Sequence, residues 1–178
     1  MRLYYLIDRI PELPYFALAF FYMSYTPPAR SMHVFAVAFF YLLTSIALGV
    51  ALKALLKTER PCEYHCIPAV RYDVPSLHTF ISVGAASFVY FVDPLYCLIM
   101  VPLGLLYMHS RLKLGLHTKN AVYAGAVLGA LTGLFYGLML YKVSFGGLEP
   151  VYAFLFFLTP VSATLFRFRY LRQPRLSQ

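Results

Sequence analysis

The residues best suited to chemistry lie in two polar stretches of an otherwise apolar chain. The charged, hydroxyl and imidazole side chains that draw attention there are Lys53, Arg60, Ser76, His78, Arg111 and His117. Three cations can neutralise the oxygens of a phosphate, a serine hydroxyl can orient it, and two histidines can divide the roles of nucleophile and general acid. The set therefore indicates phosphate binding and phosphoryl transfer.

The first polar stretch is expected to begin at the end of a helix. Lys53 and Arg60 are seven residues apart, so in a helix they lie two turns apart on one face. Pro61 would then end the helix, because proline lacks a backbone N–H. This spacing predicts a clamp of two cations. The alternative is that both residues are interfacial anchors whose charged ends reach the membrane surface.

The segment from Pro75 to His78 is expected to open the next helix. Proline suits a helix start, where the first backbone N–H groups lack partners within the helix, so Ser76 would lie where an anion is stabilised. The alternatives are that Ser76 only caps the helix and that His78 is an interfacial histidine with ordinary hydrogen bonds.

The second polar stretch supplies an arginine and a histidine. Arg111 can present two parallel N–H donors to phosphate oxygens. His117, six residues later, can offer a ring nitrogen to the phosphorus. Neither residue alone identifies a site, so the argument depends on the order of the whole set and on a shared membrane face.

The elements that must position these residues are membrane helices. Of the 178 residues, 61% are apolar and 12% are charged, which is too apolar for a soluble domain. Apolar runs bounded by charge or proline predict six spans at roughly 12–27, 32–56, 75–92, 94–110, 119–141 and 149–168. We expect an all-α bundle of about six transmembrane helices, with residues 1–178 as one domain. Two helices separate the polar stretches, so both lie on the same membrane face.

Other features restrict the partners. The net charge of +8 could indicate nucleic acid, but the basic residues sit at helix ends, which favours anionic lipid as the partner instead. Cys62, Cys66 and Cys97 are too few for a disulfide framework, and Cys62 to Cys66 lacks the second ligand pair of a zinc site. We therefore expect no metal.

Two further structural features are expected from the sequence. Met1 to Ile10 is expected to form an interfacial helix. Small residues near Gly129 and Gly133 are expected to let the fifth span pack closely against its neighbours.

With these residues in this order, the chain resembles the type-2 phosphatidic acid phosphatase superfamily of membrane lipid phosphatases. The three motifs of that family are Lys-x6-Arg-Pro, Pro-Ser-Gly-His and Ser-Arg-x5-His-x3-Asp. The matching segments are Lys53 to Pro61, Pro75 to His78 and Ser110 to His117. Leu77 replaces the glycine of the second motif. The similarity covers residues 45 to 130 or so.

The resemblance implies metal-independent phosphoryl transfer through a phosphohistidine, with no cofactor. His117 would attack phosphorus, and His78 as imidazolium would protonate the departing group, after which water would release phosphate from His117. The phosphate would be bound by the side chains of Lys53, Arg60, Ser76 and Arg111 and by the backbone N–H of Leu77. The substrate would be phosphatidate, phosphatidylglycerophosphate or a polyprenyl diphosphate.

Two departures from the motifs carry consequences. Leu77 keeps the backbone N–H but adds a bulky side chain near the phosphate, which would narrow the head groups accepted. Ala121 stands where the family has an aspartate that orients the nucleophilic histidine. Asn120, Asp73, Glu59 or a backbone carbonyl could substitute for that carboxylate. The alternative function is therefore a catalytically impaired relative that binds anionic lipid or acts as a membrane scaffold.

Charge also predicts the orientation of the chain. Apart from the three proposed site cations, ten Lys and Arg residues fall in the N-terminus, the two polar stretches and the C-terminal tail, against Arg30 and Lys142 on the other face. Positive residues prefer the cytoplasmic side of a membrane. We therefore expect a multi-pass protein with its termini and its active site in the cytosol.

Overall fold

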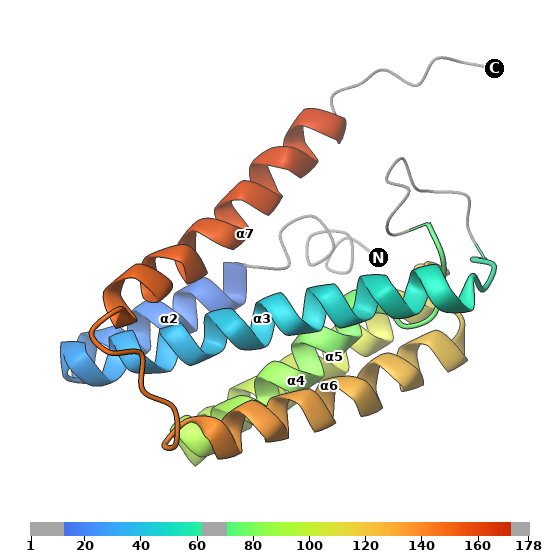
Figure 1. Cartoon of the computed structure of the whole chain (residues 1–178). Coiled ribbons are helices and arrows are strands. Elements are labelled where there is room, and N and C mark those ends of the chain that lie inside the picture. The colour runs from blue at the N-terminus through green and yellow to red at the C-terminus, as the bar shows by residue number, and fades with distance from the viewer. Residues whose placement is uncertain (1–12, 62–70, 172–178) are drawn as a thin grey trace. The chain divides into compact units, whose positions relative to one another are not determined.

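The computed structural model describes residues 13–61 and 71–171, and these residues form helices and connecting segments without strands. The elements in chain order are α2 (Leu13–Tyr25), α3 (Pro28–Leu56), α4 (Leu77–Val92), the short 3-10 helix η2 (Pro94–Tyr96), α5 (Cys97–Lys113), α6 (Lys119–Met139) and α7 (Glu149–Leu171) (Figure 1). The predicted all-α class is confirmed for this part of the chain. The expected interfacial helix at Met1 to Ile10, and Cys62 and Cys66, lie outside the described residues.

Three of the described helical segments are long and apolar enough to cross a membrane. They are Pro28–Leu56, Pro94–Lys113 and Lys119–Met139. Leu77–Val92 and Glu149–Thr159 are apolar but shorter. Since a span needs about 20 apolar residues, the three long segments are consistent with a membrane protein. The count of six spans stays a prediction.

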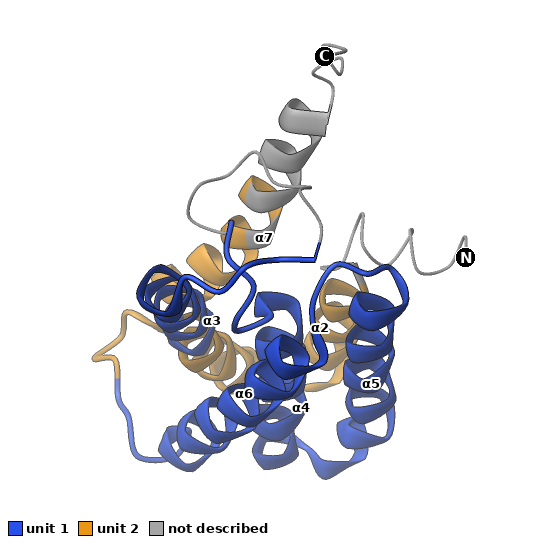
Figure 2. Cartoon of the chain, turned by 90° about the vertical axis from the view of Figure 1, so that its right-hand side faces the viewer, with its two compact units in different colours: residues 1–8, 40–144 blue, residues 9–39, 145–178 orange. Residues whose placement is uncertain are grey.

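The chain divides into two compact units (Figure 2). Unit 1 contains Phe40–Ser144, and unit 2 contains the described parts of residues 9–39 and 145–178. All of the candidate site residues belong to unit 1. The prediction of one domain over residues 1–178 stays a prediction.

Helix α4 packs against both α5 and α6 in unit 1. The contact with α6 is backbone to backbone, because a side-chain carbon added at Gly129 would collide with the carbonyl oxygen of Phe80. One added at Gly133 would collide with the carbonyl oxygen of Gly84. Small residues permit such an approach between membrane helices. The predicted packing role of these glycines is therefore confirmed.

The buried face of α3 repeats every four residues. Tyr41, Ser45, Gly49 and Lys53 are all buried, which places them in one row along the helix. The Tyr41 hydroxyl donates to the carbonyl of Ile81 in α4 at 2.7 Å, and the Ser45 hydroxyl donates to the carbonyl of Tyr41 at 2.8 Å. The row ends at Lys53, whose ammonium group lies beside the segment that precedes α4.

Helix α3 ends at residue 56, as the apolar run predicts, and does not continue to Pro61, as the motif spacing required. Its last residue is Leu56, and Lys57 adopts the left-handed conformation with φ 47°, which turns the chain out of the helix. Thr58 then pairs with the segment before α4. Its carbonyl accepts from the Asp73 N–H at 3.0 Å, and its hydroxyl accepts from the Val74 N–H at 2.9 Å.

The prediction that Lys53 and Arg60 share one helical face is therefore wrong. Lys53 belongs to the last turn of α3, whereas Arg60 lies four residues beyond the end of that helix. The physical reason is that the segment after Lys57 forms its hydrogen bonds with residues 73 and 74 instead of continuing the helix. Pro61 does not end the helix, which has already stopped.

Candidate active site

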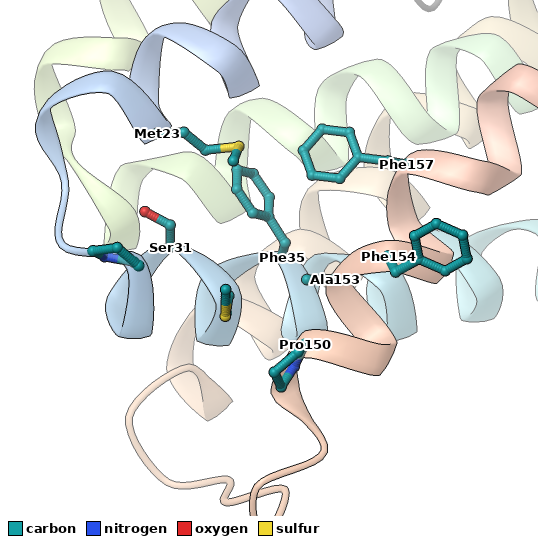
Figure 3. Close-up of a pocket in the computed structure, with 9 residues that line it drawn as sticks. Met23, Ser31, Phe35, Pro150, Ala153, Phe154 and Phe157 are labelled. Atoms are coloured by element: carbon teal, nitrogen blue, oxygen red, sulfur yellow. The ribbon is translucent and has the colours of Figure 1, made fainter.

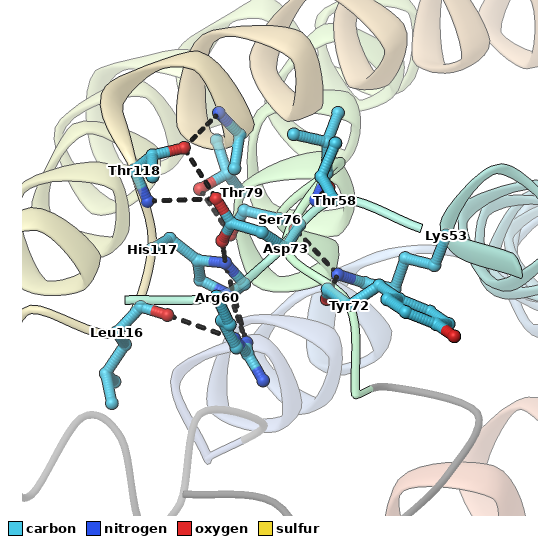
Figure 4. A network of polar contacts seen from close by, with 12 residues as sticks. Lys53, Thr58, Arg60, Tyr72, Asp73, Ser76, Thr79, Leu116, His117 and Thr118 are labelled. Atoms are coloured by element: carbon cyan, nitrogen blue, oxygen red, sulfur yellow. Dashed lines mark hydrogen bonds and ion pairs between the residues drawn. The ribbon is translucent and has the colours of Figure 1, made fainter. Parts of the chain in front are cut away.

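His117 lies in the connection between α5 and α6, and both of its ring nitrogens have partners (Figure 4). Nδ1 is 2.6 Å from Oδ1 of Asp73, and Nε2 is 2.5 Å from Nη2 of Arg60. A carboxylate only accepts hydrogen bonds and a guanidinium only donates them. The proton of the neutral ring is therefore on Nδ1, and Nε2 presents a lone pair.

Asp73 is held through both carboxylate oxygens. While Oδ1 accepts from His117, Oδ2 accepts from the hydroxyl of Thr118 at 2.5 Å and from its backbone N–H at 3.2 Å. Thr118 is the N-cap residue of α6, and its hydroxyl accepts from the Ala121 N–H at 3.3 Å. The carboxylate, which is only 1% exposed, thus binds the positive end of α6 as well as the imidazole.

Lys53 binds the backbone that carries Asp73. Its ammonium donates to the carbonyl of Tyr72 at 2.6 Å and to the carbonyl of Asp73 at 2.7 Å. The side chain is 1% exposed, so it is buried together with the segment that it holds. Lys53 therefore reaches the site predicted for it, and its described hydrogen bonds go to the protein backbone.

Arg60 joins the two polar stretches. Its Nε donates to the carbonyl of Leu116 at 3.1 Å, while Nη2 reaches the His117 ring. Arg111, in the last turn of α5, is buried, and its carbonyl accepts from the Leu116 N–H at 3.1 Å. Leu116 thereby links the two arginines along the backbone. These contacts bring the two polar stretches together, while a shared membrane face stays a prediction.

Ser76 and His78 lie at the start of α4. Ser76 is the N-cap residue and is fully buried, but its hydroxyl makes no capping hydrogen bond and accepts from the Thr79 hydroxyl at 3.2 Å. Its N–H donates to the carbonyl of Ala121 at 2.9 Å, which ties α4 to α6. His78 is the second residue of α4 and is half-buried. The roles predicted for these two side chains stay predictions.

Leu77, the first residue of α4, packs toward α3. A side-chain carbon added at Gly49 would collide with Cδ2 of Leu77, so the leucine occupies the space that the glycine leaves open. The bulk that departs from the family motif is accommodated by this glycine. A narrowing of the accepted head groups stays a prediction.

The electrostatic surroundings keep the His117 ring neutral. Burial lowers its pKa from the usual 6.5 to about 3, with the positive charge of Arg60 acting in the same direction and the hydrogen bond to Asp73 opposing both. Neutral imidazole is the form that can act as a nucleophile. At neutral pH the ring is therefore neutral, with its lone pair on Nε2.

The site contains residues that the motif spacing did not single out. Asp73 was one of four candidates for the role of the carboxylate that is absent at Ala121, and it is the one that lies beside Nδ1 of His117. Thr118 and Thr58, which hold Asp73, were not predicted. A signal existed in the sequence, because acidic residues are rare in this chain and Asp73 lies only two residues before Pro75.

A separate pocket lies within unit 2 (Figure 3). It has a volume of about 260 Å³, and the residues around it are Met23, Pro28, Ser31, Met32, Phe35, Pro150, Ala153, Phe154 and Phe157. The only polar side chain among them is Ser31, whose hydroxyl donates to backbone carbonyls of its own helix start. The residues that line this pocket include no titratable group.

Comparisons of the chain with protein-family models, with curated proteins and with solved structures find no match. Within residues 13–61 and 71–171, no group of three or more His, Cys, Asp or Glu residues could hold a metal ion. The case for a function therefore depends on the geometry around His117 and on the motifs.

Proposed function

We propose that the chain is a membrane-embedded phosphoryl-transfer enzyme with His117 as its nucleophile. The observation that carries the proposal is the state of the ring, which has its proton on Nδ1 beside Asp73 and its lone pair on Nε2 beside Arg60. A nucleophile next to a guanidinium is suited to an anionic electrophile such as a phosphate. Within this class we assign the chain to lipid phosphatases of the type-2 phosphatidic acid phosphatase kind, on the basis of its three motif matches.

The first step transfers the phosphoryl group to the ring. Arg60 moves its N–H donors from Nε2 to the phosphate oxygens as substrate arrives, and Arg111 adds a second charge from α5. The Nε2 lone pair forms a bond to phosphorus while the bond from phosphorus to the lipid oxygen breaks. That oxygen takes a proton from His78 in its imidazolium form, so the lipid leaves as an alcohol. For a diphosphate substrate, the departing oxygen belongs to the remaining phosphate.

The second step regenerates the enzyme. Neutral His78 accepts a proton from water, whose oxygen attacks phosphorus and displaces Nε2 of His117. Inorganic phosphate leaves, and both histidines return to their starting states. Ser76 and the N–H of Leu77 orient the phosphate throughout, because they lie at the N-terminus of α4, where an anion is stabilised. Catalysis in this scheme is positioning and charge stabilisation, as phosphoryl transfer requires.

The substrate is amphiphilic. The site lies at the ends of apolar helices, so an acyl or isoprenyl chain can stay in lipid while its phosphate reaches His117. Phosphatidate, phosphatidylglycerophosphate and polyprenyl diphosphate all have this form. The proposed topology is multi-pass with six spans, and the excess of positive charge places the site on the cytosolic face.

The decisive assay is phosphate release from a panel of these lipids in detergent with a chelator present. Wild type should release phosphate, and His117→Ala should not. His33→Ala is the matched control, since that histidine lies in the first part of α3, in unit 2. A radiolabelled intermediate that survives alkali but not acid would identify phosphohistidine.

Other outcomes of the same assay define the alternatives. Wild-type release no higher than that of His117→Ala would favour the impaired relative that binds anionic lipid. Transfer to an added alcohol at the expense of water would make the chain a phosphotransferase. A requirement for a divalent cation would contradict the mechanism.

The sidedness has its own test. Cys62 and Cys66 follow the first motif directly in the sequence, so they report the membrane face on which it lies. An impermeant thiol reagent added to intact cells should leave both unlabelled and should label them after the cells are opened. Labelling in intact cells would overturn the cytosolic assignment.

A further inference from the structure

We infer that Asp73 is the positioning carboxylate for His117, so that the function of the aspartate absent at position 121 is supplied from a different segment of the chain. The inference rests on the proposed function of His117 as nucleophile. Asp73 belongs to the connection before α4, 44 residues away from His117 in sequence. Its carboxylate oxygen is nevertheless 2.6 Å from Nδ1, the ring nitrogen on the far side from the proposed bond to phosphorus.

The geometry is that of an orienting group. One oxygen of Asp73 accepts the Nδ1 proton, which leaves Nε2 as the nitrogen with the lone pair. The other oxygen is fixed by the hydroxyl and N–H of Thr118. Because both oxygens are committed, the carboxylate cannot rotate without losing contacts. An anion at Nδ1 also stabilises the positive charge that the ring acquires when Nε2 bonds to phosphorus.

The backbone of Asp73 is fixed as firmly as its side chain. Its N–H donates to the carbonyl of Thr58, and its own carbonyl accepts from the Lys53 ammonium at 2.7 Å. The next N–H, that of Val74, donates to the Thr58 hydroxyl. The lysine of the first motif and the threonine after α3 therefore anchor the residue that orients the nucleophile. This assigns Lys53 a positioning role in addition to its positive charge.

Position 121 lies at a buried contact between α6 and the start of α4. Ala121 is fully buried, and its carbonyl accepts from the N–H of Ser76, which joins α6 to the start of α4. A carboxylate there would be buried in the same network as Asp73, and two neighbouring carboxylates disfavour each other's ionisation. The two positions are therefore alternatives, and this chain uses position 73.

The test substitutes Asp73→Asn, which keeps the size of the side chain and removes its charge. An amide can donate to Nδ1, which moves the ring proton to Nε2 and removes the nucleophile. We expect kcat to fall by up to about 10⁴-fold, the loss known when the orienting carboxylate of a comparable triad is replaced by an amide. KM should change by less than about threefold, because Asp73 does not touch the substrate in this scheme. Asp93→Asn, at the cap of η2, is the matched control and should leave kcat unchanged.

A second readout does not depend on turnover. In protein labelled with ¹⁵N-histidine, the signals that vanish in His117→Asn belong to His117, and in wild type they should report a proton on Nδ1. Asp73→Asn should shift them toward a proton on Nε2, whereas Asp93→Asn should not. If the ring signals shift but no lipid phosphate is hydrolysed by wild type, the proposed function fails and the positioning role stands. If wild type is active and Asp73→Asn changes neither kcat nor the ring signals, the positioning role is overturned and the proposed function stands.

Discussion

The contact between Gly49 of α3 and Leu77 of α4 allows a quantitative prediction about how this chain accommodates the leucine side chain at the start of α4. Gly49→Ala would place a methyl group against Cδ2 of Leu77. The far end of a leucine can move, so the collision strains the packing without excluding the fold. Leu77→Ala removes the obstructing atoms, and the next neighbour of the new methyl, Cδ1 of Phe80, is at an ordinary distance of 3.6 Å.

Two opposing effects set the magnitude. Alanine stabilises a helix interior by about 1 kcal/mol relative to glycine, while an extra methyl in a packed contact costs about 1–3 kcal/mol. In the wild-type background Gly49→Ala should therefore be neutral or destabilising by up to about 2 kcal/mol, which follows from the difference of these two ranges. In the Leu77→Ala background only the helix gain remains. The coupling energy between the two positions should be about 1–3 kcal/mol.

The assay is thermal unfolding of the four proteins of this double-mutant cycle in one detergent, followed by circular dichroism. For a chain of this size, 1 kcal/mol corresponds to about 2–4 °C in Tm. Gly129→Ala is the control, because its methyl would meet the backbone carbonyl of Phe80, which no side-chain truncation can relieve. Its loss of stability should be the same with Leu77 or with Ala at position 77. Equal effects of Gly49→Ala in both backgrounds would refute the proposed contact.

Three further predictions concern the site. Ala121→Asp should lower both phosphate release and Tm. Asp73 already binds Nδ1 of His117, and a second buried carboxylate would destabilise the network. Strong activation would contradict the orienting role of Asp73. In pH profiles of kcat/KM, wild type should show no acidic limb from His117 between about pH 5 and 7, because the pKa of that ring is lowered to about 3. Arg60→Gln removes a positive neighbour, so it should raise the pKa of His117 and move the acidic limb to higher pH. An identical profile shape for both proteins would argue against the Arg60 contact. Thr118→Val should reduce kcat by about tenfold or more, because it removes a hydroxyl that holds the Asp73 carboxylate in place. Thr118→Ser keeps the hydroxyl and should retain most of the activity. Equal losses in the two variants would show that the hydroxyl is not the relevant group.

The helices were predictable because membrane helices follow simple composition rules. The apolar run expected at 32–56 corresponds to Pro28–Leu56, and the run at 119–141 corresponds to Lys119–Met139. Charge or proline bounds these runs, and the interior of a bilayer requires backbone hydrogen bonds to be made within the segment. Composition gave the end of the apolar run at residue 56, but the motif spacing wrongly extended the helix to Arg60. The left-handed turn at Lys57 has no strong sequence signal and depends on the pairing of Thr58 with Asp73 and Val74.

Two residues of the candidate site that contact each other were predictable from the sequence, but most of the hydrogen bonds around them were not. The motif spacing identified His117 and Arg60, and the even number of helices between the two stretches correctly predicted that they meet. It could not decide which group binds Nδ1. Asp73 had to be chosen from several candidates because a hydrogen-bond partner that is distant in sequence is determined by tertiary packing. The same limit applies to Lys53, whose contact with backbone carbonyls cannot be read from residue type.

The separation of Asp73 from His117 along the chain sets the order in which the protein can be completed during synthesis. The ribosome adds Asp73 to the chain before it has made α5, the imidazole or the threonine at the start of α6. Until those 44 residues follow, the carboxylate has only Lys53 and Thr58 near its backbone and none of the partners of its side-chain oxygens. A nascent chain that stops before residue 117 therefore lacks both groups that bind the oxygens of the carboxylate. His117 and Thr118 are adjacent in sequence, so packing of the N-terminal end of α6 against this segment brings both partners to the carboxylate together.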